Sequence, residues 1–200
     1  MKRQMILSLM FLLLGAMTCV AQTKPPVTDI RKVDFLNFTY NPTQCSQEYG
    51  RQGIGRTVAV KDGEFKNKSV YFSVVSDKIV YADLTGDGKE EAIVPVDCGA
   101  MGANFSRSEV NVYTLENGRA ALLAATNDKI MERDYRAGYP DSDGYWGINE
   151  NGIKVNSGNL QIEVLVDGPH AAPKYIATLE YGLTGKALKL KGKPARRNAG

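Results

Sequence analysis

The sequence has few of the residues on which catalysis and metal binding most often depend. It contains one histidine, His170, one tryptophan and three cysteines in 200 residues. It has no G-x-S-x-G nucleophile motif, no H-E-x-x-H zinc motif and no G-x-x-x-x-G-K phosphate loop. A lone histidine in a turn-rich stretch is far more often a surface or packing residue than a catalytic one. The sequence therefore favours a non-enzymatic protein.

Long apolar runs are also missing, except at the start of the chain. Two basic residues precede an apolar run over residues 5–17, and small residues follow at 19–21. This pattern predicts a signal peptide over residues 1–21 and an exported protein, periplasmic or secreted, with no transmembrane segment after cleavage. An alternative is a lipid anchor at Cys19, although Ala16-Met17-Thr18 departs from the usual lipobox.

Charge and composition divide the rest of the chain. Residues 22–28 read as a linker, 29–192 as a single β-rich domain, and 193–200 as a basic flexible tail. The net charge is +3, and the body has no basic stripe with interleaved aromatic residues. Nucleic acid is therefore not an expected partner.

Short β-favouring runs recur along residues 29–192, separated by Gly, Asn and Asp. The turns Asp62-Gly63 and Asn117-Gly118 favour hairpins, and Asn151-Gly152 is read as a further turn. The pattern predicts an all-β fold of mostly antiparallel hairpins, forming a sandwich or a meandering barrel-like sheet with few or no helices. Residues 46–56 are expected to be a loop. Arg119–Ala125 fits a strand, although two helical turns are the alternative.

Two cysteines lie outside the predicted signal peptide, Cys45 and Cys98. An even pair in an exported protein predicts one disulfide, which would stabilise the fold mainly by restricting the unfolded chain. The alternative is two buried free thiols.

An acidic loop, Asp83–Glu91, lies between two apolar runs. Its oxygen-bearing side chains stand at positions 1, 3, 5 and 9, the spacing that a hard divalent cation prefers. Asp and Gly are also ordinary turn formers, so a metal-free Asx-type turn is the alternative.

The same nine residues resemble the calcium loops of FG-GAP/VCBS-type repeats, as in integrin α-chain propellers. The resemblance implies that Asp83, Asp87 and Glu91 are carboxylate ligands of a structural Ca²⁺ and that Lys89 supplies its carbonyl. Thr85 replaces the usual Asp or Asn, which implies weaker binding. The motif does not repeat at a fixed period, so a propeller is not expected. The loop is also similar to a hairpin, followed by a cysteine, in bacterial exported lipoprotein-like domains of unknown function.

The stretch Met131–Gly147 is the least regular and the most aromatic part of the sequence. Its rings combine flat apolar faces with polar edges, which suits recognition of a cell-envelope glycan or protein; they are Tyr135, Tyr139, Tyr145 and Trp146. The competing explanation is that they cap the sheet. The alternative function is an extracytoplasmic, glycosidase-like hydrolase using carboxylates of this loop, among them Asp134, Asp141 and Asp143.

Overall fold

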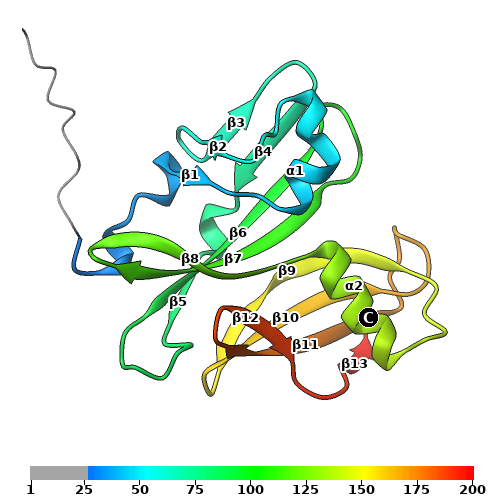
Figure 1. Cartoon of the computed structure of the whole chain (residues 1–200). Helices are drawn as coiled ribbons and strands as arrows, with labels where there is room; N and C mark the ends of the chain where they lie inside the picture. Colours follow the sequence, from blue (N-terminus) through cyan, green and yellow to red (C-terminus); the bar gives the residue numbers. More distant parts are fainter. Residues whose placement is uncertain (1–26) are drawn as a thin grey trace, which may run out of the picture.

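The computed structural model describes residues 27–200 and consists mostly of antiparallel β-strands in two large sheets (Figure 1). The predicted signal peptide, Cys19 and most of the predicted linker lie outside the described residues. Within the described residues, no helix is long and apolar enough to span a membrane. The two antiparallel sheets confirm the all-β, sandwich-like fold class that the strand and turn pattern predicts.

The first sheet has six strands in the order β3-β4-β6-β7-β8, with β5 beside β6. Strand β6 has partners along its whole length, because β4 pairs with its C-terminal half and β5 with its N-terminal end. The strands are β3 (Glu64–Lys66), β4 (Val70–Val74), β5 (Val80–Ala82), β6 (Glu91–Ala100), β7 (Arg107–Glu116) and β8 (Arg119–Asn127). Arg119–Ala125 is thus a strand, as expected from the Asn117-Gly118 turn.

The second sheet has five strands in the order β12-β11-β10-β9, with β13 beside β11. Its members are β9 (Tyr145–Asn156), β10 (Asn159–Val166), β11 (Tyr175–Thr184), β12 (Ala187–Leu190) and β13 (Ala195–Asn198). Residues 193–200, which the sequence suggests are a flexible tail, therefore contain a paired strand, since Tyr175–Thr178 of β11 lies opposite Ala195–Asn198.

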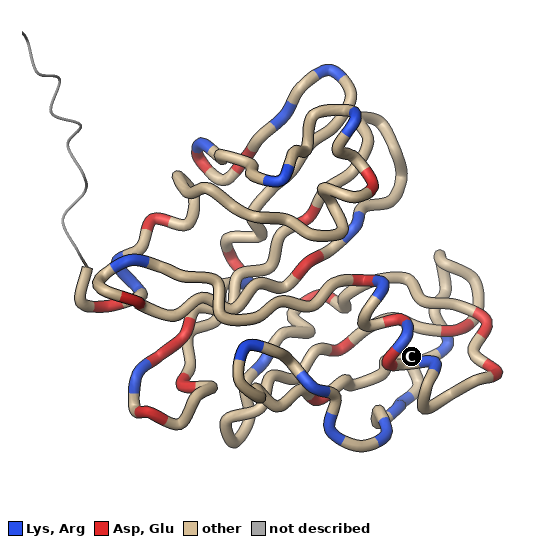
Figure 2. The backbone as a smooth tube through the Cα atoms, viewed as in Figure 1, with Lys and Arg blue, Asp and Glu red and all other residues tan. Residues whose placement is uncertain are grey.

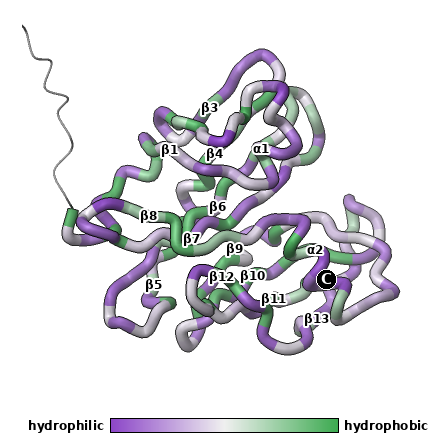
Figure 3. The backbone as a smooth tube through the Cα atoms, viewed as in Figure 1, coloured by the Kyte–Doolittle hydropathy of each residue, from purple (hydrophilic) through white to green (hydrophobic). Residues whose placement is uncertain are grey.

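An N-terminal segment covers the outer face of the six-stranded sheet (Figure 1). It contains short helices and a two-stranded ladder: η1 (Ile30–Lys32), η2 (Phe35–Asn37), β1 (Thr39–Tyr40), α1 (Gln44–Tyr49), η3 (Gly50–Gln52) and β2 (Val58–Ala59). A further turn of 3₁₀ helix, η4 (Ser76–Lys78), joins β4 to β5. Charged residues occur in the loops, the helices and the strands, whereas the apolar ones concentrate in the strands of both sheets (Figures 2 and 3).

Two apolar layers result, one on each face of the six-stranded sheet. Alternation along β6 sends Val94 and Val96 to the N-terminal segment and Ile93 to the five-stranded sheet. The second layer also contains the inward-facing residues of β10, which alternate between buried and half-buried along the strand. Burial of these side chains from both elements is the main source of stability for the two-sheet arrangement.

Two helices correct the sequence reading. The stretch expected to be irregular begins with α2 (Asp128–Gly138), and the loop expected over residues 46–56 contains α1 and η3. In α2 the Asn127 side chain accepts a hydrogen bond from the Ile130 N–H, which caps the first turn. Met131 and Tyr135, four residues apart, bury one face of the helix against the second apolar layer. The helix is short, so tertiary packing rather than propensity stabilises it.

A disulfide joins Cys45 of α1 to Cys98 of β6, as expected from the even cysteine pair. Glu109, buried in β7, also fixes α1 to the sheet, because its carboxylate accepts hydrogen bonds from the backbone N–H groups of Thr43 and Cys45. A carboxylate at the first turn of a helix satisfies N–H groups that have no partner within the helix.

Candidate functional site

The acidic loop connects β5 to β6 and is organised by its own hydrogen bonds. Asp83 accepts bonds from the N–H groups of Gly86 (2.6 Å) and Gly88 (2.8 Å). These bonds lower the pKa of Asp83, the one from Gly88 most strongly. Asp87 accepts a bond of 2.9 Å from the Lys89 N–H. The loop therefore has the local geometry of an Asx-type turn.

Glu91 behaves differently from the other proposed ligands, because it is buried at the start of β6. Its carboxylate accepts hydrogen bonds from the Leu84 N–H (2.9 Å), the Thr85 N–H (3.3 Å) and the Thr114 hydroxyl (3.3 Å). Burial nevertheless raises its pKa. Within residues 27–200, no three acidic, histidine or cysteine side chains lie close enough together to hold a metal ion. The loop as folded does not present the full calcium ligand set, and calcium binding stays a prediction.

The four aromatic residues of the expected ligand surface do not form one surface. Tyr135 is fully buried, and its hydroxyl donates to Asp167 at 2.8 Å, so it is a core residue. Tyr139 lines a pocket next to the C-terminal strand, whereas Tyr145 and Trp146 line a separate cleft. The expectation of a joint surface is corrected at Tyr135, because this ring faces inward from α2.

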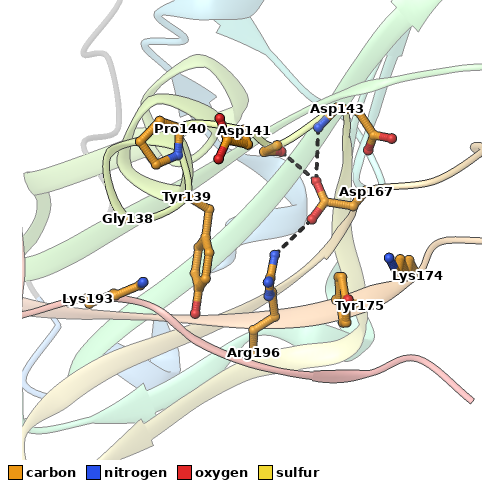
Figure 4. Close-up of a pocket in the computed structure, with 11 residues that line it drawn as sticks. Gly138, Tyr139, Pro140, Asp141, Asp143, Asp167, Lys174, Tyr175, Lys193 and Arg196 are labelled. Atoms are coloured by element: carbon orange, nitrogen blue, oxygen red, sulfur yellow. Dashed lines mark hydrogen bonds and ion pairs between the residues drawn. The ribbon is translucent and has the colours of Figure 1, made fainter.

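The pocket at Tyr139 has a volume of about 400 Å³ and is shown in Figure 4. The guanidinium of Arg196 lies between the rings of Tyr139 and Tyr175, 4.1 and 4.2 Å from their centroids. The same group donates a hydrogen bond of 3.2 Å to Asp167. Burial alone would raise the pKa of Asp167, but bonds from Ser142, Tyr135 and the Asp143 N–H, together with the Arg196 charge, lower it.

These contacts attach β13 to the ends of α2 and β10, so the pair of the buried Asp167 with the partly exposed Arg196 has a structural role here. Two of the three carboxylates proposed for a hydrolase lie in this pocket. Asp141 and Asp143 line it, but Asp134 bonds to Arg133 and to the Tyr181 hydroxyl instead. The three carboxylates therefore do not all lie together, and a hydrolase using the Met131–Gly147 loop stays a prediction.

The second hollow lies where the β6–β7 loop approaches the five-stranded sheet, and we name it the intersheet cleft. It consists of two adjoining hollows of about 410 Å³ each, which share Phe105, Trp146 and His170. The first is also lined by Arg107, Asp128 and Tyr145, and the second by Tyr71, Asp97 and Ser108. Phe105 is 53% exposed, which is unusual for a large apolar side chain in this protein.

Trp146 forms one wall of the cleft and is held in place from two sides. Its indole N–H donates a hydrogen bond of 3.1 Å to the Gly168 carbonyl, and the His170 ring lies edge-on to it at 5.4 Å. Residue 144 must be glycine for this arrangement, since a Cβ there would lie 2.6 Å from the indole ring. The indole is thus positioned before any ligand arrives, which reduces the entropy lost on binding.

Asp97 and Asp128 lie on the cleft floor, on either side of Ser108. Asp97 stands opposite Ser108 in the β6–β7 ladder and accepts a hydrogen bond of 2.7 Å from its hydroxyl. Asp128, the first residue of α2, accepts bonds of 2.9 Å from the Ser108 N–H and the Tyr145 hydroxyl. Burial raises the pKa of Asp97, and it raises that of Asp128 to about 6.

Perturbed carboxylates in a cavity are common at functional sites. Two residues of the ligand surface expected from the sequence, Tyr145 and Trp146, line this cleft, whereas the sequence analysis did not single out Phe105, Asp97 or Asp128. The only sequence indication for Phe105 was a large aromatic residue in a Gly-containing loop.

Comparison of the sequence with family models, with curated proteins and with solved structures finds no match in any of the three.

Proposed function

We propose that this chain is an exported, non-enzymatic β domain that binds a cell-envelope glycan in the intersheet cleft. The observation that supports the proposal is the combination of aromatic side chains from both sheets with buried hydrogen-bond acceptors on the floor between them. Export is supported by the sequence pattern of residues 1–21 and agrees with the disulfide.

A glycan matches this combination better than a purely apolar ligand does. Sugar rings have apolar faces that stack on aromatic side chains, and hydroxyl groups that donate to carboxylates. Trp146 and Phe105 offer the faces, and Asp97 and Asp128 offer the acceptors. The volume of each hollow is within the range of small-molecule sites.

Fluorescence tests the proposal directly, because Trp146 is the only tryptophan in the chain. The purified, oxidised protein would be titrated with a panel of neutral, acidic and basic oligosaccharides. We expect at least one class to change the emission in a saturable way and to give a matching dissociation constant by calorimetry. If no class does so at millimolar concentration, glycan binding is refuted.

For the acidic loop we propose a structural role, with Ca²⁺ as its cofactor. Binding requires the carboxylates of Asp83 and Glu91 to turn towards each other, since they now accept hydrogen bonds from different parts of the loop. A thermal melt with Ca²⁺ and with a chelator measures the effect. An unchanged melting temperature would make the loop an ordinary hydrogen-bonded turn.

The second candidate function is a carboxylate-based hydrolase, and one observation favours it in the intersheet cleft. Asp97 and Asp128 both approach Ser108, and the raised pKa of Asp128, about 6, suits a general acid near neutral pH. Prolonged incubation with a bound oligosaccharide and analysis of the products decides between the two functions. Unchanged oligosaccharide supports the binding domain, and reducing ends that disappear with Asp128→Asn support the hydrolase.

A further inference from the structure

The floor of the intersheet cleft carries negative charge that the surrounding residues do not neutralise by ion pairing. Among the residues that the structure describes, neither Asp97 nor Asp128 has a basic side chain within ion-pair distance. Arg107 also lines the cleft, but its Nε donates to Glu48 at 2.9 Å. Lys129 pairs with the same glutamate at 3.3 Å. Arg107 and Lys129 are thus paired with Glu48, and Lys78 and Arg107 act on Asp97 and Asp128 only at distances longer than an ion pair.

The walls of the cleft add a second preference for positive charge. Electron-rich faces of Trp, Tyr and Phe attract cations, most strongly when the cation is partly removed from water. Phe105 already has the Arg107 guanidinium 5.4 Å from its centroid, and Trp146 and Tyr145 line the same hollow. Aromatic walls above uncompensated carboxylates are the arrangement that recognises an ammonium group.

We propose that the intersheet cleft binds glycans whose amino sugars carry free, protonated amino groups, with Asp97 and Asp128 as the recognising carboxylates. This inference rests on the proposed glycan-binding function and names its substrate class. The ammonium group donates to the two carboxylates across Ser108, while the sugar rings stack against Trp146 and Phe105. An N-acetylated sugar of the same backbone lacks the charge and leaves the carboxylates without a cationic partner, so the favourable charge–charge contribution to affinity is lost.

The charge requirement predicts how binding depends on pH. The groups that face Asp128 are Asp97 from β6, Arg107 from β7, Tyr145 from β9 and His170 from the β10–β11 loop. Because the pKa of Asp128 is about 6 in the free protein, acidification below that value protonates the carboxylate and weakens binding. At high pH the sugar amine loses its proton. The affinity is therefore bell-shaped with respect to pH, and Asp128→Asn weakens the acidic limb and leaves the part that comes from Asp97.

The test compares two probes with the same β-1,4 backbone, a glucosamine tetrasaccharide and its fully N-acetylated counterpart. Trp146 fluorescence and calorimetry would be recorded at pH 6.5 in low salt. We expect the amine form to bind at least tenfold more tightly, and the preference to fall below threefold in Asp97→Asn and in Asp128→Asn. Both variants would first be checked for an unchanged far-UV spectrum.

The outcomes separate the inference from the function on which it rests. Equal binding of both tetrasaccharides, or tighter binding of the N-acetylated one, refutes the ammonium preference and leaves glycan binding in place. Absence of binding by both, together with the remaining panel, refutes glycan binding itself. Amine binding that persists in Phe105→Ala with unchanged Trp146 emission places the contact elsewhere, for example on the acidic β5–β6 loop, and also overturns the inference.

Discussion

Replacing Asp128 by asparagine is expected to raise the free energy of unfolding relative to the wild type, and this gain should be larger at neutral pH than at acidic pH. Asparagine keeps the shape of the side chain and can accept the Ser108 N–H bond, while its amide can donate to the Tyr145 oxygen. The substitution therefore removes the charge with little loss of contact. The comparison therefore measures how much the ionised, buried carboxylate lowers the free energy of unfolding.

The magnitude follows from the difference between the folded and unfolded pKa values. Asp128 has a pKa of about 6 in the folded protein, against the ordinary value of 3.8, and its side chain belongs to a residue that is 4% exposed. At 1.36 kcal/mol per pH unit, this gap of about two units corresponds to about 3 kcal/mol.

The sign is fixed by which state holds the proton. Below about pH 3 both states of the wild-type protein are protonated at Asp128, and the group contributes fully to stability. Between pH 4 and 6 only the folded state keeps the proton, so this contribution is lost as the pH rises. The free energy of unfolding of Asp128→Asn minus that of the wild type should therefore increase by about 2 kcal/mol from pH 4 to pH 7, because part of the full effect already occurs below pH 4.

Urea denaturation of both proteins at pH 4, 5, 6 and 7 measures this difference. Titration of all other groups, such as Asp167 with its lowered pKa, is common to both proteins and cancels to first order. A difference that stays constant within about 1 kcal/mol would show that Asp128 ionises normally and that water reaches the cleft floor. The argument from burial would then be wrong.

Three further outcomes are expected elsewhere in the molecule. A disulfide-free double serine variant should lose about 4 kcal/mol in chemical denaturation, because the bridge closes a loop with a sequence separation of 53; a loss below 1 kcal/mol would contradict the loop-closure argument. Asp87→Ala should abolish any calcium-dependent rise in melting temperature, and an unchanged rise would refute its assignment as a ligand. Arg196→Ala should cost about 1–2 kcal/mol, since it removes the partly exposed charged partner of Asp167 and contacts with two aromatic rings, whereas Lys193→Ala removes only one contact with Tyr139 and should cost less; equal effects would count against a structural role of the pair.

The strands could be predicted because their alternation and turn residues agree with the final fold. At Asn117-Gly118 both residues have positive φ, as a tight hairpin turn requires. Asn151-Gly152 misled the prediction, because β9 continues through it. Asn151 has φ of 55°, and the β9–β10 pairing shifts register nearby, so this dipeptide forms an irregularity within the strand. An Asn-Gly dipeptide can therefore form either a hairpin turn or an irregularity within a strand, and the pairing of the neighbouring strands determines which of the two occurs.

The helix α2 was harder to predict from the sequence than the strands were. The capping Asn127, the buried pair Met131 and Tyr135, and the Glu132–Arg136 ion pair at i,i+4 were all visible. These features span only three turns, which is too short to predict a stable helix by themselves. The helix forms because its apolar face packs against the second apolar layer.

The intersheet cleft was the least predictable feature, because its residues come from separate elements. Asp97, Ser108 and Asp128 become neighbours through cross-strand register, and Phe105 and Trp146 through the packing of one sheet against the other. No local pattern indicates such contacts. The acidic loop shows the opposite situation, since its motif is local and clear while its ligands are divided between a turn and a buried strand end.

The most direct test of the cleft as a ligand site compares two exposed residues of one loop. Phe105, 53% exposed, lines the cleft, whereas Met101, 49% exposed, does not, and truncating either should leave the fold intact. We predict that Phe105→Ala weakens oligosaccharide binding at least tenfold, as measured through the Trp146 emission, and that Met101→Ala changes it less than twofold. Equal dissociation constants for the two variants would contradict the account.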